Sequence, residues 1–361
     1  LSRRQRQMCI RDRYMCYLRC LFLVVLLAGL SACSEDNRGK GRKAMEDLAT
    51  SELLFQEISL ETILGRPFQI EIVDSILIIG DNIDGKALFL YNLSDSSWVR
   101  VLNIGQGPGE VLAPLAIDVS DRNHTISVLQ RQSGICRRYR VDRLFNDSIF
   151  DFQEVSLEGA DRVAQMHDGY ACLGMFEQGI LSFFDAQGKE SECIDLYSRF
   201  DIRDISAKYR LFQGRLAFNE RARCLMFAPS YASEIAFYAE QDDGSWMKKD
   251  SFCLGTGGFE DRISESSGFE LLKDDIRNCM DACSSENYFY MLYDGTDLGH
   301  TRKIEFRYVI RFTANGVLDC VYKVNPTVRN ICVSYDDSAV YVLMIGKDGE
   351  YAIGKSELSI R

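Results

Sequence analysis

The feature that most constrains the fold is a group of short strand-like segments that recurs along the chain. From residue 68 onward, runs rich in Val, Ile, Tyr and Phe alternate with short breaks of Gly, Asp, Asn and Ser, which is typical of strands joined by hairpin turns. Four such runs make one unit, and the first run of each unit begins near residues 68, 115, 162, 215, 277 and 329. Six units of roughly 50 residues with four strands each predict an all-β chain folded as a six-bladed β-propeller.

One further strand-like run, residues 53–60 (LLFQEISL), precedes the first unit. A propeller whose chain ends do not meet leaves exposed sheet edges, so we expect this run to pair into the last blade and close the ring. The alternative, a β-sandwich, has similarly spaced turns, but it does not explain a unit that recurs six times.

The N-terminal segment has the features of an export signal. The apolar run at residues 21–27 (LFLVVLL) is too short to span a bilayer, which takes about 20 residues. Arg19 precedes it and small residues follow it, as in a secretory signal that starts at Met15. The motif Leu-Ser-Ala-Cys at residues 30–33 resembles the bacterial lipobox, which implies lipid attachment to Cys33. An ordinary signal peptide with a chance cysteine is the alternative.

These features divide the chain into four parts. The first part carries charge ahead of the expected start without any periodicity, so we interpret it as a spurious translation or a wrong start site. A polar, charged stretch without apolar alternation follows the lipobox and predicts a flexible tether. The expected boundaries are 1–14 for the spurious segment, 15–32 for the signal peptide, 33–51 for the tether and 52–361 for the propeller domain.

The charge of the chain after the signal excludes one class of partner. The full chain has 42 basic and 53 acidic residues; removing the six arginines and one aspartate of residues 1–32 leaves 36 and 52, a net charge of −16. Non-specific nucleic-acid binding needs a basic footprint, so we expect no nucleic-acid partner.

Lipid on Cys33 would attach the chain to a membrane. The acidic residues 34–37 (SEDN) resemble surface-export signals of Bacteroidetes lipoproteins, so we expect a monomeric outer-membrane lipoprotein of the cell envelope, facing either the periplasm or the surface.

Catalytic and metal-binding motifs are absent from the sequence. Nine cysteines follow Cys33 without any Cys-x-x-Cys pair, and several of them stand in apolar strand patterns, which favours packing in the core. The three histidines His124, His167 and His300 fall in different units, and neither HExxH nor GxSxG occurs. We therefore expect no metal and no cofactor, and we assign no catalytic residue.

A glycine-rich loop at residues 105–110 (GQGPGE) carries a resemblance to a known family. A phosphate-binding loop needs a helix directly after its glycines, whereas Pro114 here leads into a predicted strand. The loop, the lipobox and the blade count resemble the TolB-like six-bladed β-propeller lipoproteins of Bacteroidetes, a family of undefined function. The resemblance implies a six-bladed propeller over about residues 50–361. The loop residues are Gly105, Gly107, Pro108, Gly109 and Glu110, and we interpret them as a crossover between blades in which Glu110 either caps the loop or faces a ligand.

Four arginines recur with the repeat. Arg162, Arg215, Arg277 and Arg329 each stand at the start of a predicted inner strand, separated by 53, 62 and 52 residues. Equivalent positions of a propeller lie around one ring, so the four guanidinium groups would meet at one mouth of the channel. Arginine binds carboxylates in a bidentate manner, which predicts an anion site for an acidic sugar or a carboxylate-bearing peptide end. Ion pairs between blades, or solvated turns, are the alternative.

The sequence alone therefore favours a non-catalytic function. We expect a membrane-anchored envelope lipoprotein whose propeller binds or scaffolds a protein or glycan partner. The alternative is an envelope enzyme, a glycan lyase or hydrolase, with its site at the channel mouth. Clustered carboxylates with perturbed pKa values in the channel would favour that alternative.

Overall fold

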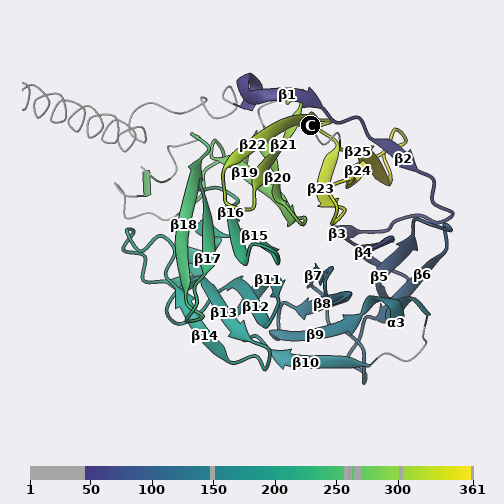
Figure 1. The fold of residues 1–361 in the computed structure, drawn as a ribbon, viewed down its shortest axis with the longest axis horizontal. Coiled ribbons are helices and arrows are strands. Elements are labelled where there is room, and N and C mark those ends of the chain that lie inside the picture. The colour runs from purple at the N-terminus through teal and green to yellow at the C-terminus, as the bar shows by residue number, and fades with distance from the viewer. Residues whose placement is uncertain are drawn as a thin grey trace, which may run out of the picture.

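The computed structural model describes residues 45–146, 151–255, 260, 262–263, 270–300 and 304–358. These residues form six antiparallel sheets arranged as the blades of a ring, so the chain is a six-bladed β-propeller (Figure 1). The chain runs from the innermost to the outermost strand in the first four blades, and in the fifth from the innermost strand to the fourth. The expected fold class is confirmed.

The first three blades follow one another without interruption. Their strands are β3 (Pro67–Val73), β4 (Ile76–Ile83), β5 (Lys86–Asn92) and β6 (Trp98–Asn103) in blade 1; β7 (Leu115–Ser120), β8 (Thr125–Gln130), β9 (Ile135–Arg140) and β10 (Phe152–Ser156) in blade 2; and β11 (Ala160–Met166), β12 (Gly169–Gly174), β13 (Leu181–Asp185) and β14 (Glu190–Ile194) in blade 3.

The last three blades complete the ring. Their strands are β15 (Gly214–Asn219), β16 (Cys224–Pro229), β17 (Glu234–Glu240) and β18 (Trp246–Cys253) in blade 4; β19 (Ile276–Ser284), β20 (Tyr288–Asp297), β21 (Arg307–Thr313) and β22 (Leu318–Val324) in blade 5; and β23 (Val328–Val333), β24 (Ala339–Ile345) and β25 (Tyr351–Glu357) in blade 6. All six inner strands begin within two residues of the positions predicted from the repeat.

An N-terminal strand supplies the missing fourth strand of blade 6. Strand β2 (Gln56–Ile58) lies within the predicted closing segment and pairs antiparallel with β25, with Gln56 opposite Lys355. The buried side chain of Leu53 packs in the core between blades 5 and 6. The pairing joins the two ends of the domain, so the predicted closure of the ring is confirmed.

A second N-terminal strand was not expected. Strand β1 (Ala49–Glu52) pairs parallel with β22 as the fifth strand of blade 5, and the nearby Met45 is 1% exposed in the core of that region. Residues 45–51, which the sequence placed in the tether, therefore lie against blade 5. Backbone hydrogen bonds to β22 and one buried methionine hold these residues there. Such contacts leave no alternation of apolar and polar residues in the sequence, so the sequence did not indicate a strand.

Burial is greatest in the second strands of several blades and lowest in the outer strands, which explains why simple alternation is rare in the sequence. Every residue of β8, β12 and β16 is buried, because these strands are covered by the neighbouring blades on both faces. The outer strand β18 is mostly exposed. Aromatic rings fill the space between blades 3 and 4, where Phe183 and Trp246 stack with centroids 4.5 Å apart.

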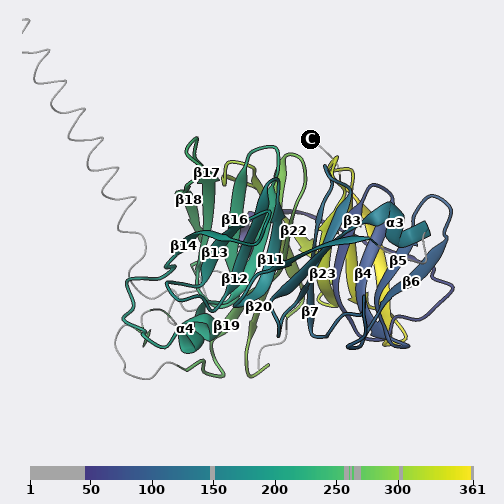
Figure 2. The same ribbon diagram turned by 90° about the horizontal axis from the view of Figure 1, so that it is seen from below.

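Two short helices connect the strands. Helix α3 (Val141–Asn146) follows β9, and helix α4 (Ile205–Phe212) lies at one edge of the ring between blades 3 and 4 (Figure 2). The carboxylate of Asp204 caps α4 by accepting the backbone N–H of Ser206 at 2.9 Å. Phe212 is fully buried in the core, so α4 is fixed against the propeller and holds Tyr209 toward the inner strands.

Candidate functional site

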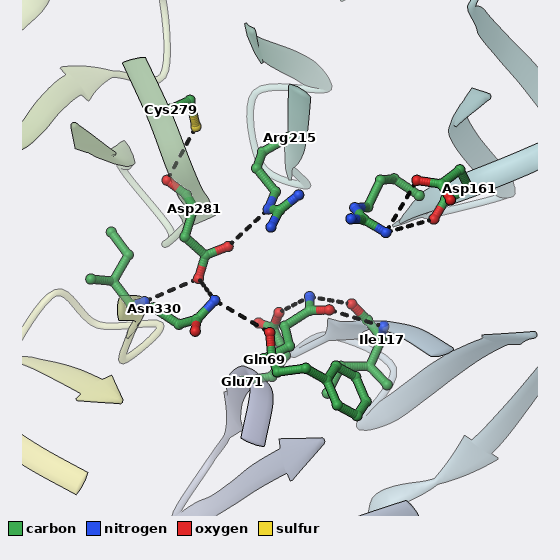
Figure 3. A network of polar contacts seen from close by, with 11 residues as sticks. Gln69, Glu71, Ile117, Asp161, Arg215, Cys279, Asp281 and Asn330 are labelled. Carbon is green, nitrogen blue, oxygen red and sulfur yellow. Dashed lines mark hydrogen bonds and ion pairs between the residues drawn. The ribbon is translucent and has the colours of Figure 1, made fainter. Parts of the chain in front are cut away.

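Side chains of the inner strands join several neighbouring blades around the propeller axis (Figure 3). The amide of Gln69 on β3 bonds both backbone groups of Ile117 on β7. Asp281 on β19 accepts the backbone N–H of Ile331 and the amide of Asn330, both at 3.1 Å. These contacts bring polar groups to the axis and fix their positions.

A cavity of about 200 Å³ opens where the inner strands begin. It is lined by residues of the first five blades, and we call it the arginine cavity. Its charged and polar lining residues are Arg66, Gln69, Glu71, Asn82, Asp118, Arg131, Arg162, Arg215 and Asp281. Two of the four repeat-related arginines, Arg162 and Arg215, therefore line one concave site.

Asp161 is shared by two of these arginines. Its Oδ1 accepts Nε of Arg131 at 2.7 Å, and its Oδ2 lies 3.2 Å from Nη1 of Arg162. Tyr209 of α4 donates its hydroxyl to Oδ2 at 2.7 Å. Burial disfavours the carboxylate, but Arg162, the Tyr209 hydroxyl and Arg131 outweigh burial and lower the pKa of Asp161.

The second pair in the cavity is longer. Nε of Arg215 lies 3.4 Å from Oδ1 of Asp281, and Figure 3 shows the Arg215 guanidinium directed at this carboxylate. Burial and then the nearby Arg215 lower the pKa of Arg162 to about 10. Arg131, Arg162 and Arg215 thus share the two carboxylates of Asp161 and Asp281. With Asp161 and Asp281 both ionised, one positive charge stays uncompensated.

The other two repeat-related arginines lie elsewhere. Nε of Arg277 lies 2.8 Å from Oδ2 of Asp294, whose side chain is fully buried and also pairs with Arg307 at 2.7 Å. Arg329 is exposed. Burial lowers the pKa of Arg307 although Asp294 opposes this shift, and the nearby positive charge of Arg329 lowers the pKa further. The predicted ring of four is therefore divided between the arginine cavity and an ion-pair cluster of blades 5 and 6.

Two further arginines of the cavity, Arg131 and Arg66, do not belong to the repeat-related pattern. Arg131 follows β8, the second strand of blade 2, and Arg66 precedes β3, whereas the pattern covers only the starts of inner strands from Arg162 onward. The sequence pattern also did not indicate the other polar lining residues, Gln69, Glu71, Asn82, Asp118 and Asp281. The turn that follows β8 leads toward the same mouth as the starts of the inner strands, and this topological rule would have found Arg131.

Buried carboxyl groups lie deeper along the axis. Burial, together with the neighbouring Asp118, raises the pKa of Glu71 well above its ordinary value. Burial raises the pKa of Asp118 to about 8, although Oδ2 of Asp118 accepts the backbone N–H of Gln165 at 2.5 Å. A pKa of about 8 favours the protonated form of Asp118 at neutral pH, and burial disfavours the charged form of Glu71 in the same way.

A smaller cavity of about 40 Å³ lies at the opposite end of the inner strands and also contacts Glu71 and Asp118. We call it the acidic cavity because Asp121 and Glu220 line it as well. Burial and then Glu220 raise the pKa of Asp121 to about 7. Ser120 at the end of β7 donates its hydroxyl to Glu220 of blade 4, so this contact narrows the far end of the axis.

The glycine-rich loop forms the crossover between blades 1 and 2. The carboxylate of Glu110 accepts the backbone N–H of Gly107 at 2.8 Å, and Gly109 has a φ of +78°. A Cβ at Gly105 would collide with that carboxylate. Of the two roles that the sequence left open for Glu110, the structure places its side chain as the cap of the loop.

The described cysteines lie mostly in the core. Those that are buried are Cys136, Cys172, Cys224, Cys279, Cys283 and Cys332. Among the residues that the structure describes, no group of three or more His, Cys, Asp or Glu side chains is arranged to hold a metal ion. In the same residues, no helix has the length and apolar character needed to cross a bilayer. Cys33 and the acidic residues 34–37 lie outside the described residues.

Comparison with solved structures supports the fold. A protein from Bacteroides fragilis described as exported superposes with a TM-score of 0.55 at 12% identity, over 86% of this chain and 95% of that chain. The PQQ-bound aldose sugar dehydrogenase of Streptomyces coelicolor matches with a TM-score of 0.47 at 9% identity, over 86% and 99%. The WD40 repeats of RRP9 match with a TM-score of 0.45 at 9% sequence identity, over 85% of this chain and 100% of that chain. No protein-family model and no curated protein sequence matches the chain.

Proposed function

We propose that the chain is a lipid-anchored protein of the bacterial envelope whose propeller binds a carboxylate-bearing ligand without transforming it. The observation that carries the proposal is the arginine cavity, in which three guanidinium groups share two carboxylates. A concave site with uncompensated, partly desolvated positive charge attracts an anion strongly, even in a chain with a net charge of −11.

A binding role suits the groups that line the cavity. Asp118 and Gln69 already fasten β7 to its neighbours, and the amide of Gln69 bonds Glu71 at 2.8 Å. These contacts give the carboxyl groups of Glu71 and Asp118 a structural role at the propeller axis. Arg162 and Arg215 keep N–H groups that no described residue accepts, so they can donate to a ligand.

Isothermal titration calorimetry on the purified full chain tests the binding role with acetate, lactate, N-acetylalanine and galacturonate as probes. We expect at least one carboxylate to bind, and Arg162→Ala to weaken it roughly 10- to 100-fold, because a hydrogen bond to a charged group contributes about 1.5–3 kcal/mol. Arg221→Ala, an exposed arginine of the first turn of blade 4, is the matched control and should bind as wild type. No binding of any carboxylate would refute the anion site.

The membrane attachment is a separate part of the proposal. The lipobox at Cys33 and the family resemblance support an outer-membrane lipoprotein of Bacteroidetes. Growth with an alkyne-tagged palmitate should label the wild-type chain, and Cys33→Ser should abolish the label. Cys253→Ser is the control, because Cys253 is an exposed cysteine far along the chain. Equal labelling of the wild-type chain and the Cys33→Ser variant would contradict lipid attachment at this position.

One observation favours a second candidate, an envelope enzyme that cleaves acidic glycans. Burial raises the pKa of Asp118 to about 8, which is in the range of a general acid at neutral pH, and burial raises the pKa of the neighbouring Glu71 as well. Incubation with uronate-containing polysaccharides would then release reducing ends or unsaturated products. The activity should be lost in Glu71→Gln while galacturonate still binds. Absence of product in the wild-type chain with intact ligand binding would leave the binding role as the function.

A further inference from the structure

The size of the arginine cavity restricts its ligand. Its volume of about 200 Å³ is smaller than the roughly 300–1,000 Å³ of sites for drug-sized molecules. It is nevertheless larger than a carboxylate alone requires. A single ring with its substituents, or the last residue of a polymer, is the class of ligand that such a space admits.

The hydrogen-bonding groups restrict it further. Oδ1 of Asn82 is buried and accepts no hydrogen bond from the described residues. The carboxyl groups of Glu71 and Asp118 line the cavity as well, beside the guanidinium N–H groups. Hydroxyl groups both donate and accept, so a polyhydroxylated ligand satisfies both kinds of group. An ammonium group would meet uncompensated positive charge, which disfavours free amino acids.

An aromatic ring completes the lining. Phe68 is half-buried and contributes to the cavity wall. Its ring lies so close to Gly80 on β4 that a Cβ there would overlap it, so the absence of a side chain at residue 80 makes this ring position possible. A flat apolar surface beside charged donors suits a sugar ring, which has apolar C–H faces and a polar rim.

We propose that the arginine cavity binds the terminal hexuronate of an acidic glycan. Its carboxylate contacts Arg162 and Arg215, its hydroxyl groups contact Asn82 and the carboxyl groups, and one face of its ring contacts Phe68. This inference rests on the proposed anion-binding function, and it names the ligand class of the same site.

Calorimetry with five probes tests the ligand class on the full chain. Galacturonate and glucuronate carry both carboxylate and ring, galactose lacks the carboxylate, and lactate and N-acetylalanine lack the ring. We expect a uronate to bind at least tenfold tighter than lactate or N-acetylalanine, and galactose at least tenfold weaker than the uronate. If N-acetylalanine or lactate binds as tightly as the uronates, the hexuronate proposal fails while the anion site stands. If no carboxylate binds, both fail.

Paired variants separate the recognition of the ring from that of the carboxylate. Asn82→Leu and Phe68→Leu should each weaken uronate binding at least fivefold and leave lactate binding unchanged, whereas Arg162→Ala should weaken both. An unchanged melting temperature would establish that each variant is folded. If Asn82→Leu and Phe68→Leu leave uronate binding intact, or weaken lactate binding equally, the ring is not recognised by these residues and the proposal is overturned.

Discussion

The buried carboxyl group of Asp118 gives the fold a pH dependence that can be measured directly. Its pKa is about 8 in the folded chain and 3.8 in its ordinary state, and burial is the main cause of the difference. Between these two values the folded chain holds a proton that the unfolded chain has lost. The free energy of unfolding therefore falls as the pH rises through this window. Below both pKa values, the ionisation of Asp118 no longer makes the free energy of unfolding depend on pH.

The magnitude follows from the linkage of one proton. Each pH unit within the window lowers the free energy of unfolding by about 1.4 kcal/mol per proton. The titration of Asp118 therefore lowers the free energy of unfolding by about 3 kcal/mol between pH 5 and pH 7. Asp118→Asn removes the titration and keeps an oxygen that can accept the Gln165 N–H. We expect the variant to gain stability relative to wild type as the pH rises, with a slope shallower by about 1.4 kcal/mol per unit.

Urea denaturation at pH 5, 6, 7 and 8, followed by the fluorescence of Trp98 and Trp246, measures the two slopes. The control is Asp95→Asn. Asp95 is exposed, and the hydroxyl and backbone N–H of Ser97 lower its pKa, so its titration lies below this range and its removal should not change the slope. Parallel curves for wild type and Asp118→Asn would refute the assignment of a protonated carboxyl to this position.

Three further substitutions test the packing of the ring by urea denaturation at constant pH. Gly159→Ala should destabilise the fold by about 1–3 kcal/mol, since φ is +86° and the new Cβ would lie 2.5 Å from the carbonyl oxygen of Met175; a neutral effect would contradict this geometry. Arg307→Ala should cost about 3 kcal/mol because it removes one of the two arginine partners of the buried Asp294. Equal stability would show that Arg277 and the hydroxyl of Thr296 suffice as partners. Leu53→Ala should cost about 2–5 kcal/mol by opening a cavity beside the closing strand, and a loss below 1 kcal/mol would mean that this contact does not secure the ring.

The architecture could be predicted because its signal is repeated six times. Each hairpin turn and each inner strand gives only a weak indication, but a common period reinforces them, and the closing strand follows from the need to avoid an open edge. Strand β1 lacked such support. It pairs through the backbone with β22, and of the described residues that precede it only Met45 is buried, so no pattern distinguished residues 45–51 from a tether.

The candidate site could be predicted only in part. The repeat predicts the position of a residue within its blade, but it does not predict which side chain that residue contacts. Arg215 and Arg277 occupy equivalent positions at the start of β15 and β19. Arg215 meets Asp281 beside the arginine cavity, whereas Arg277 meets Asp294 on the neighbouring strand of its own blade. These carboxylates come from different strands, and their proximity depends on the register of the folded sheets.

The distribution of charge along the axis determines how a ligand can enter. All six inner strands begin at the mouth that holds the arginine cavity, while Asp121 and Glu220 follow the ends of β7 and β15 at the far mouth. A site at which two carboxyl groups lie close together, with the pKa of Asp121 raised to about 7, repels an anion at and above neutral pH. The contact of Ser120 with Glu220 also narrows that end. The proposed acidic ligand would therefore enter from the arginine side, and only its terminal group would reach the carboxyl groups of Glu71 and Asp118 on the axis.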